Sequence, residues 1–161
     1  MQDLAAEIGR LLKARKETVA VAESSAGGLI SAALVAVPGC SAFYLGGGVI
    51  YTKVAREQLA GIPREDVRGM RSATEPYARL LARRTRERLG ATWGVAETGA
   101  SGPTGNPYGD PPGHSAIAVS GPMDAALVVE TGIADREANM REFALRALKL
   151  LESCLQRPGA L

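Results

Sequence analysis

Histidine, cysteine and aromatic residues are scarce in this sequence of 161 residues. It contains one histidine, His114, and two cysteines, Cys40 and Cys154. The cysteines lie far apart and form no Cys-x-x-Cys pair, so we expect reduced thiols and no set of metal ligands. A single histidine argues against a Ser-His-Asp triad, and a lone histidine at the start of a strand is more often structural than catalytic. We therefore expect neither a metal nor an organic cofactor.

Long apolar runs and an excess of one charge sign are also missing. No run approaches the roughly 20 apolar residues of a membrane-spanning helix, and the net charge is only +2. We therefore expect neither a membrane nor a nucleic acid as partner. The first residues carry no basic leader followed by an apolar segment, which favours a cytoplasmic protein. The length and the 46% apolar content predict one domain over residues 1–161.

Helical and strand periodicities alternate along the chain. We predict helices over residues 4–12, 27–36 and 53–59, from 75 and after 135, and strands near 19–21, 43–51, 93–96, 115–120 and 125–131. Asp3, Thr74 and Asp135 are the predicted helix N-caps. The last two strands are expected to be an antiparallel pair. This order predicts a three-layer α/β/α sandwich with a mixed, mostly parallel sheet.

The segment Ala22-Glu23-Ser24-Ser25-Ala26-Gly27-Gly28 joins a predicted strand to a predicted helix. The backbone N–H groups at the start of such a helix are unpaired and partly positive, and the glycines let a ligand approach. A nucleophilic hydroxyl or an anionic ligand suits this turn. The alternative is an ordinary serine cap followed by flexible glycines.

A second candidate segment is the long loop over residues 98–113, which is rich in glycine, proline and hydroxyl side chains. Its backbone N–H groups suit an anion, but its spacing matches neither the Walker nor the Rossmann pattern. A plain surface excursion is the alternative. Because ligands in α/β sheets bind at the carboxyl ends of strands, we expect the pocket where the Ser24 turn, the strand end at Tyr51 and this loop meet.

Four motifs occur in order, the first being Ala-Glu-Ser-Ser-Ala-Gly-Gly at 22–28. The second lies within 38–53 and consists of Pro-Gly-Cys-Ser, then Phe-Tyr, then Gly-Gly, and finally Tyr-Thr-Lys. The third is Thr-Gly-Ala-Ser-Gly-Pro at 98–103, and the fourth is Ala-Asp-Arg at 134–136. Together they resemble the signatures of the CinA C-terminal domain family, which also occurs alone as nicotinamide-nucleotide amidohydrolase. The resemblance covers about the whole chain. It implies hydrolysis of nicotinamide mononucleotide, a small-molecule nucleotide substrate, to nicotinate mononucleotide and ammonia, and it implies a homo-oligomer.

The resemblance also implies roles for single residues. Ser24 matches the family's nucleophile and Tyr51 its assisting tyrosine. Backbone N–H groups from Ala26 to Gly28 are the expected donors to the oxyanion. Arg136 or Arg56 is expected to bind the substrate phosphate. The residues expected to bind substrate are Glu23, Ser25, Gly27, Gly28, Gly46, Gly47, Glu97, Thr98, Gly99, Gly102 and Arg136.

The chain departs from the family at Arg56, where the pattern has a catalytic lysine. Arginine does not act as a base because its pKa stays above about 12. Lys53 lies three residues earlier and shares a helical face with Arg56, whose charge favours the neutral amine. Either Lys53 has taken the base role, or both are surface cations and the chain is a non-catalytic binding module.

A second departure is Glu97, which precedes Thr98-Gly99 where the family tends to have an apolar residue. We expect its carboxylate to contact the ligand or to pair with Arg56. The alternative is a solvated ion pair of little energetic value.

Overall fold

The computed structural model describes residues 1–157, so residues 158–161 of the predicted domain lie outside the described part. Five strands form one sheet in the order β2-β1-β3-β4-β5. They are β1 (Val19–Glu23), β2 (Tyr44–Val49), β3 (Trp93–Ala100), β4 (His114–Ser120) and β5 (Ala125–Glu130). Strand β1 pairs in parallel with β2 and β3, whereas β3–β4 and β4–β5 are antiparallel. The mixed sheet is confirmed, but parallel pairs are half of the pairings, because no helix connects β3 to β4 or β4 to β5.

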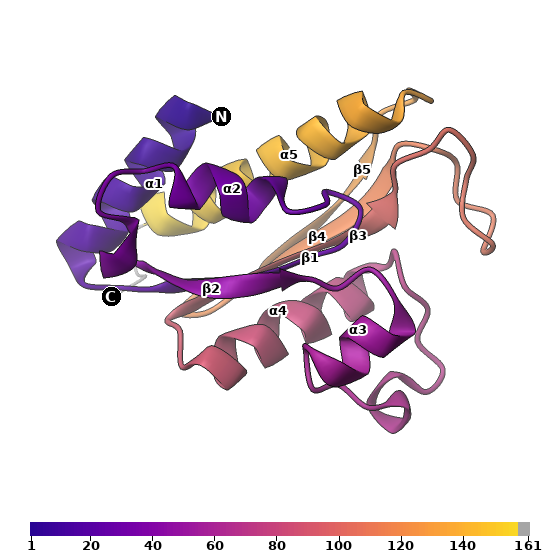
Figure 1. Ribbon diagram of the computed structural model, residues 1–161, viewed down its shortest axis with the longest axis horizontal. Helices are drawn as coiled ribbons and strands as arrows, with labels where there is room; N and C mark the ends of the chain where they lie inside the picture. The colour runs from indigo at the N-terminus through magenta and orange to yellow at the C-terminus, as the bar shows by residue number, and fades with distance from the viewer. Residues whose placement is uncertain (158–161) are drawn as a thin grey trace.

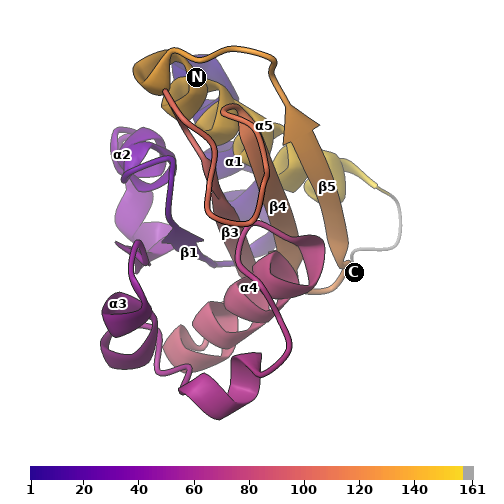
Figure 2. The same cartoon turned by 90° about the vertical axis from the view of Figure 1, so that its right-hand side faces the viewer.

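Helices cover both faces of the sheet, as predicted (Figure 1). Helices α1 (Gln2–Arg15), α2 (Leu29–Val35) and α5 (Arg136–Gln156) lie on one face, and α3 (Lys53–Gln58) and α4 (Glu75–Leu89) lie on the other. The two helical layers also separate in the view of Figure 2. Two short 3₁₀ helices, Cys40–Ala42 and Arg64–Val67, complete the described elements. None of the helices within residues 1–157 has the length and hydrophobicity of a membrane span.

The two faces of the sheet carry cores of different character. Large side chains such as Trp93, Phe43 and Phe143 are completely buried under α1, α2 and α5. The other face is built from alanines of the strands, so α4 packs close to it. A Cβ atom at Gly94 of β3 would lie 2.1 Å from the carbonyl oxygen of Ala82 in α4, so this position requires glycine.

Of the three predicted N-cap residues, Thr74 and Asp135 occupy the N-cap position, and only Asp135 makes a side-chain cap bond. The Asp135 carboxylate accepts from the Ala138 N–H at 2.8 Å. Asp3 lies inside α1, which begins at Gln2, so that predicted cap was wrong. The Thr74 hydroxyl donates to the Arg71 carbonyl at 2.7 Å and makes no cap bond. Strand β3 also extends to Ala100, further than predicted, so the loop that follows is shorter than the predicted one and runs over residues 101–113.

Candidate functional site

Three parallel strands end side by side, and the predicted segments meet there. Glu23 pairs with Val49, and the Ile50 N–H donates to the Glu23 carbonyl at 2.6 Å, which aligns the ends of β1 and β2. A cavity of about 360 Å³ lies at these ends, and we name it the serine cavity. It is lined by Ser24, Ile50, Tyr51, Thr52, Lys53, Ser72, Ala73, Tyr77, Thr98, Gly99, Asn106, Pro107 and Tyr108.

Glu97 of β3 binds the Ser24 turn through hydrogen bonds, and its side chain is completely buried. One carboxylate oxygen, Oε2, accepts from the backbone N–H groups of Ser24 at 3.1 Å and Ala26 at 2.8 Å. The other, Oε1, accepts from the hydroxyls of Ser25 and Ser115, the latter at 2.8 Å. Four donors therefore converge on one carboxylate and fix the backbone on both sides of Ser24.

The environment of Glu97 differs from the predicted one. Burial raises the pKa of its carboxyl above the ordinary value, and the four hydrogen bonds only partly oppose this effect. The predicted pairing with Arg56 was wrong, because Arg56 instead donates to the Ile62 carbonyl at 3.1 Å and to Glu57 at 2.7 Å. Glu97 does not line the serine cavity, so it acts on the turn rather than on a ligand.

A second buried carboxylate, Glu23, holds the other side of the turn. Its oxygens accept from the backbone N–H groups of Ile30 at 3.0 Å and Ser31 at 2.9 Å, so Glu23 caps the start of α2. This contact, and the complete burial of the side chain, separate Glu23 from its predicted role in substrate binding. Gly27 and Gly28 have φ values of 67° and 103°, which other residues rarely adopt, and they carry the chain from the turn into α2.

Ser24 itself is partly exposed, and its hydroxyl has no hydrogen-bond partner among residues 1–157. Two of the three predicted oxyanion donors are engaged inside the turn. The Ala26 N–H donates to Glu97, and the Gly27 N–H donates to the Ser24 carbonyl at 3.0 Å. Within the described chain, the N–H groups of Ser25 and Gly28 have no such partner, but neither residue lines the serine cavity.

Tyr51 and Arg136 meet beside the serine cavity. Tyr51 is 58% exposed, and its hydroxyl accepts from Nη2 of Arg136 at 3.0 Å. Nη1 of the same guanidinium donates to the Gly102 carbonyl. A second cavity, of about 270 Å³, has Arg136 in its wall together with Ser25, Tyr51, Gly99 and Gly102, and we name it the Arg136 cavity. The two cavities share Tyr51 and Gly99, so they adjoin.

Lys53, the candidate base, and Arg56, which stands three residues later, do not line the same set of cavities. Lys53 is the first residue of α3, after the Thr52 cap, and it lines the serine cavity. Arg56 is 5% exposed and lines a neighbouring cavity of about 780 Å³, which we name the Arg56 cavity. Lys53 therefore lines the same cavity as Ser24, whereas Arg56 does not.

Gly46 and Gly47 lie outside these cavities. Both line a separate cavity of about 360 Å³ beside Leu59 and Leu89. A Cβ at Gly47 would lie 2.3 Å from the carbonyl oxygen of Val21, so β2 packs against β1 more closely than a side chain allows. Gly47 thus has a packing role, and neither glycine lines the serine cavity or the Arg136 cavity.

Residues that the sequence reasoning missed form the outer wall of the serine cavity. Ala73, at a φ of 59°, donates its N–H to the Thr98 hydroxyl at 3.1 Å, and its carbonyl lies 2.8 Å from Nε2 of His114. Arg71 donates to the Tyr108 carbonyl at 3.3 Å and to Asp110 at 3.2 Å. The segment before α4 is therefore joined to the loop 101–113. A non-glycine residue with positive φ leaves no signal in the sequence.

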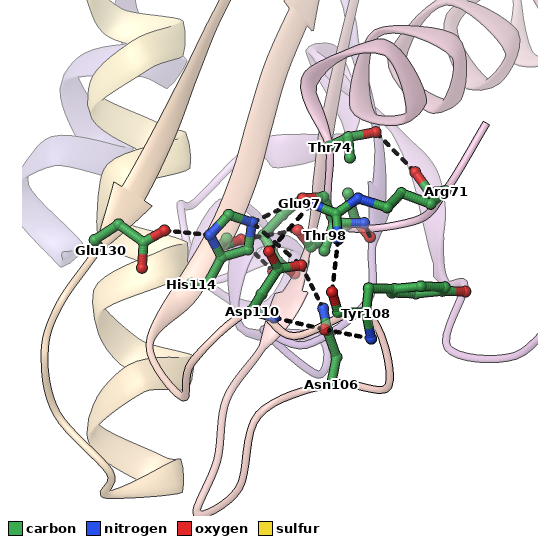
Figure 3. A network of polar contacts seen from close by, with 11 residues as sticks. Arg71, Thr74, Glu97, Thr98, Asn106, Tyr108, Asp110, His114 and Glu130 are labelled. Carbon is green, nitrogen blue, oxygen red and sulfur yellow. Dashed lines mark hydrogen bonds and ion pairs between the residues drawn. The ribbon is translucent and has the colours of Figure 1, made fainter.

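His114 is buried and both of its ring nitrogens face acceptors. Nδ1 contacts the Glu130 carboxylate and Nε2 contacts the Ala73 carbonyl, while Asp110 lies 3.8 Å from Nε2 (Figure 3). Because both partners are acceptors, the imidazolium form, which has a hydrogen on each ring nitrogen, is the form that satisfies both contacts. Burial alone would lower the pKa of His114, but the contacts with Glu130, Ala73 and Asp110 outweigh it and raise the pKa. His114 is thus a structural residue, in agreement with the prediction.

Comparison with known proteins gives a consistent result. The sequence model for the CinA C-terminal domain matches residues 1–155. A CinA-like protein of Anaeromyxobacter sp. (strain K) is 40% identical over 145 residues, 90% of this chain and 36% of its own length. A CinA-like protein of Prochlorococcus marinus (strain MIT 9313) is 40% identical over 156 residues, 96% of this chain and 36% of its own length. The chain thus spans a little over a third of the curated relatives it matches.

Solved structures of similar proteins share the fold. The competence/damage inducible protein CihA from Agrobacterium tumefaciens superimposes with a TM-score of 0.86 at 28% identity, covering 97% of this chain and 95% of that one. The competence damage-inducible protein A from Klebsiella pneumoniae subsp. pneumoniae MGH 78578 gives 0.89 at 26% identity, with 98% of each chain covered.

Proposed function

The chain belongs to the CinA C-terminal domain family, and from this premise we propose that it is an amidohydrolase that converts nicotinamide mononucleotide to nicotinate mononucleotide and ammonia. The observation that carries the proposal is the Ser24 hydroxyl, which has no hydrogen-bond partner within residues 1–157, in a turn that Glu97 fixes at the mouth of a cavity. A nucleophile held in one orientation needs little reorganisation to reach a bound amide.

The chemistry follows from the groups around that hydroxyl. Ser24 Oγ attacks the carboxamide carbon while Lys53, in the same cavity wall, acts as the base that takes the hydroxyl proton. The N–H group of Ser25, in the wall of the adjoining Arg136 cavity, stabilises the resulting oxyanion. Ammonia leaves with the proton from Lys53, and a water molecule then hydrolyses the acyl-serine to release the carboxylate and the free hydroxyl.

Arg136 supplies the counter-charge for the substrate phosphate. It is an exposed arginine in the Arg136 cavity, next to the glycine-rich loop. Its guanidinium is already oriented by the Gly102 carbonyl and the Tyr51 hydroxyl, so it binds with little loss of side-chain entropy. Arginine–phosphate contacts are charge-assisted and geometrically specific.

A second candidate function is a nucleotide-binding module without amidase activity. The observation that favours it is Arg56, which stands in place of the family's lysine and is turned toward Glu57 and the Ile62 carbonyl, away from Ser24. In that case the cavity binds the nucleotide and leaves its amide intact.

One assay separates the two functions. Purified protein is incubated with nicotinamide mononucleotide, and released ammonia is measured beside a Ser24→Ala control. Ammonia release by the wild type and none by Ser24→Ala supports the amidohydrolase. Saturable binding of the nucleotide with no ammonia release by either protein rejects the amidohydrolase and supports the binding module.

A further inference from the structure

A cavity larger than the serine cavity lies next to it. The Arg56 cavity, of about 780 Å³, lies between α3, the segment 64–72 and the tip of the loop 101–113. It shares four wall residues with the serine cavity, namely Lys53, Ser72, Tyr77 and Tyr108. Its size lies in the range of small-molecule sites, roughly 300–1,000 Å³. Nothing in the proposed amidase reaction occupies this space.

The charge of the Arg56 cavity favours an anion. Four cationic side chains line it, Lys53, Arg56, Arg64 and Arg68, against the two carboxylates Glu57 and Glu65. Arg56 is the buried member, 5% exposed, and its guanidinium is oriented by the Ile62 carbonyl and Glu57. A guanidinium that is both desolvated and held in place binds a phosphate group more strongly than a solvated one does.

An aromatic surface lies at the junction of the two cavities. Tyr108 is 47% exposed and lines both of them. Its position is fixed, since Arg71 binds its carbonyl at 3.3 Å and lies 5.6 Å from the ring centroid. Every nucleobase has a π-face that stacks on such a ring. A nucleoside phosphate suits this arrangement, because the cations bind its phosphate and the aromatic ring stacks on its base.

We propose that the Arg56 cavity binds a nucleoside monophosphate as an inhibitor, distinct from the substrate in the serine cavity. The phosphate lies among Arg56, Arg64 and Arg68, and the base stacks on Tyr108. Inhibition acts through Lys53, which lines both cavities, because an anion bound in the Arg56 cavity attracts the Lys53 side chain away from Ser24. Binding of the nucleotide in the Arg56 cavity does not depend on the proposed amidase function, whereas the inhibitory effect rests on it.

Binding is tested first, without any turnover. AMP is titrated calorimetrically into the wild type, into Arg64→Ala/Arg68→Ala, and into the control Arg10→Ala/Arg146→Ala. Arg64 and Arg68 are exposed, so the double variant keeps the fold. The control removes two exposed arginines far from the cavity for the same change in net charge. We expect the AMP dissociation constant to rise about tenfold or more in the first variant, as lost charge-assisted bonds require, and to stay unchanged in the control.

The ligand class and the mode of inhibition are tested next. Tyr108→Leu is expected to weaken AMP binding but not binding of inorganic phosphate, which has no base. In the wild type, AMP is expected to lower kcat for nicotinamide mononucleotide. Absence of AMP binding, equal affinity in the arginine variant, or inhibition that is purely competitive with substrate each overturns the proposal. If the wild type releases no ammonia, the proposed function fails, while the calorimetric result still decides whether the site exists.

Discussion

Two substitutions of Glu97 distinguish the contribution of its hydrogen bonds from the contribution of its negative charge. In Glu97→Ala, the backbone N–H groups of Ser24 and Ala26 lose their acceptor inside the protein. An unpaired buried donor costs about 1–3 kcal/mol, so two of them cost about 2–6 kcal/mol. The buried Ser25 hydroxyl also loses its acceptor, which adds to this cost, whereas the Ser115 hydroxyl loses less, because the Thr98 carbonyl lies 3.3 Å from it. Total stabilities of domains are about 5–15 kcal/mol, so Glu97→Ala removes a large share.

Glu97→Gln should be tolerated. Its amide oxygen takes the place of Oε2 and accepts from Ser24 and Ala26, and its NH₂ group donates to the hydroxyls of Ser25 and Ser115, which turn to accept. Burial raises the pKa of the Glu97 carboxyl in the folded state. The wild type therefore loses stability relative to Glu97→Gln as the pH rises above the ordinary glutamate pKa of about 4.3. The loss ends once the pH exceeds the raised pKa of Glu97 in the folded state.

Urea unfolding measures these differences. Trp93, the one tryptophan, is buried in β3 and serves as the fluorescence probe. The midpoint is recorded between pH 4 and 8 for the wild type, both Glu97 variants and the surface control Glu142→Ala. Ammonia release is measured in parallel, and we expect it to be lost in Glu97→Ala and largely kept in Glu97→Gln. Equal losses of stability in the two Glu97 variants, or a loss below about 1 kcal/mol in Glu97→Ala, would refute the hydrogen-bond reasoning.

Three further predictions follow from the site. Lys53→Met should abolish ammonia release as completely as Ser24→Ala, because a nucleophile and its base act as one unit; an active Lys53→Met would assign the base elsewhere. Arg136→Ala should raise the dissociation constant for nicotinamide mononucleotide by about tenfold or more, measured calorimetrically in the Ser24→Ala background; unchanged affinity would move the phosphate to another site. His114→Gln should destabilise the fold by about 1.5–3 kcal/mol at pH 5–6, where the imidazolium bonds are complete. Because the folded pKa of His114 is raised, this difference should shrink as the pH rises through that raised value, and a pH-independent difference in urea midpoints would contradict an imidazolium.

The alternation of helices and strands could be predicted from the sequence because it depends on local periodicity. The buried strands β1 and β4 each contain four consecutive apolar residues, Val19–Ala22 and Ala116–Val119, and Asp135 caps α5 by accepting from the Ala138 N–H three residues later. The meeting of the Ser24 turn with Tyr51 and the loop after β3 was also predictable, since parallel strands end at one edge of the sheet. These features depend only on residues that are close in sequence or on a general rule of sheet topology, so the sequence alone predicts them.

The contacts that define the site were not predictable in this way. Glu97 binds a turn more than 70 residues away in sequence, and only the pairing of β1 with β3 brings the two together. Lys53 and Arg56 lie on one short helix and share the Arg56 cavity, yet only Lys53 reaches the serine cavity. Ala73 takes its positive φ because Thr98 and His114 hold it from both sides. Sequence determined which residues carry chemistry, whereas tertiary packing decided which of them touch, because direction and burial depend on partners distant in the chain.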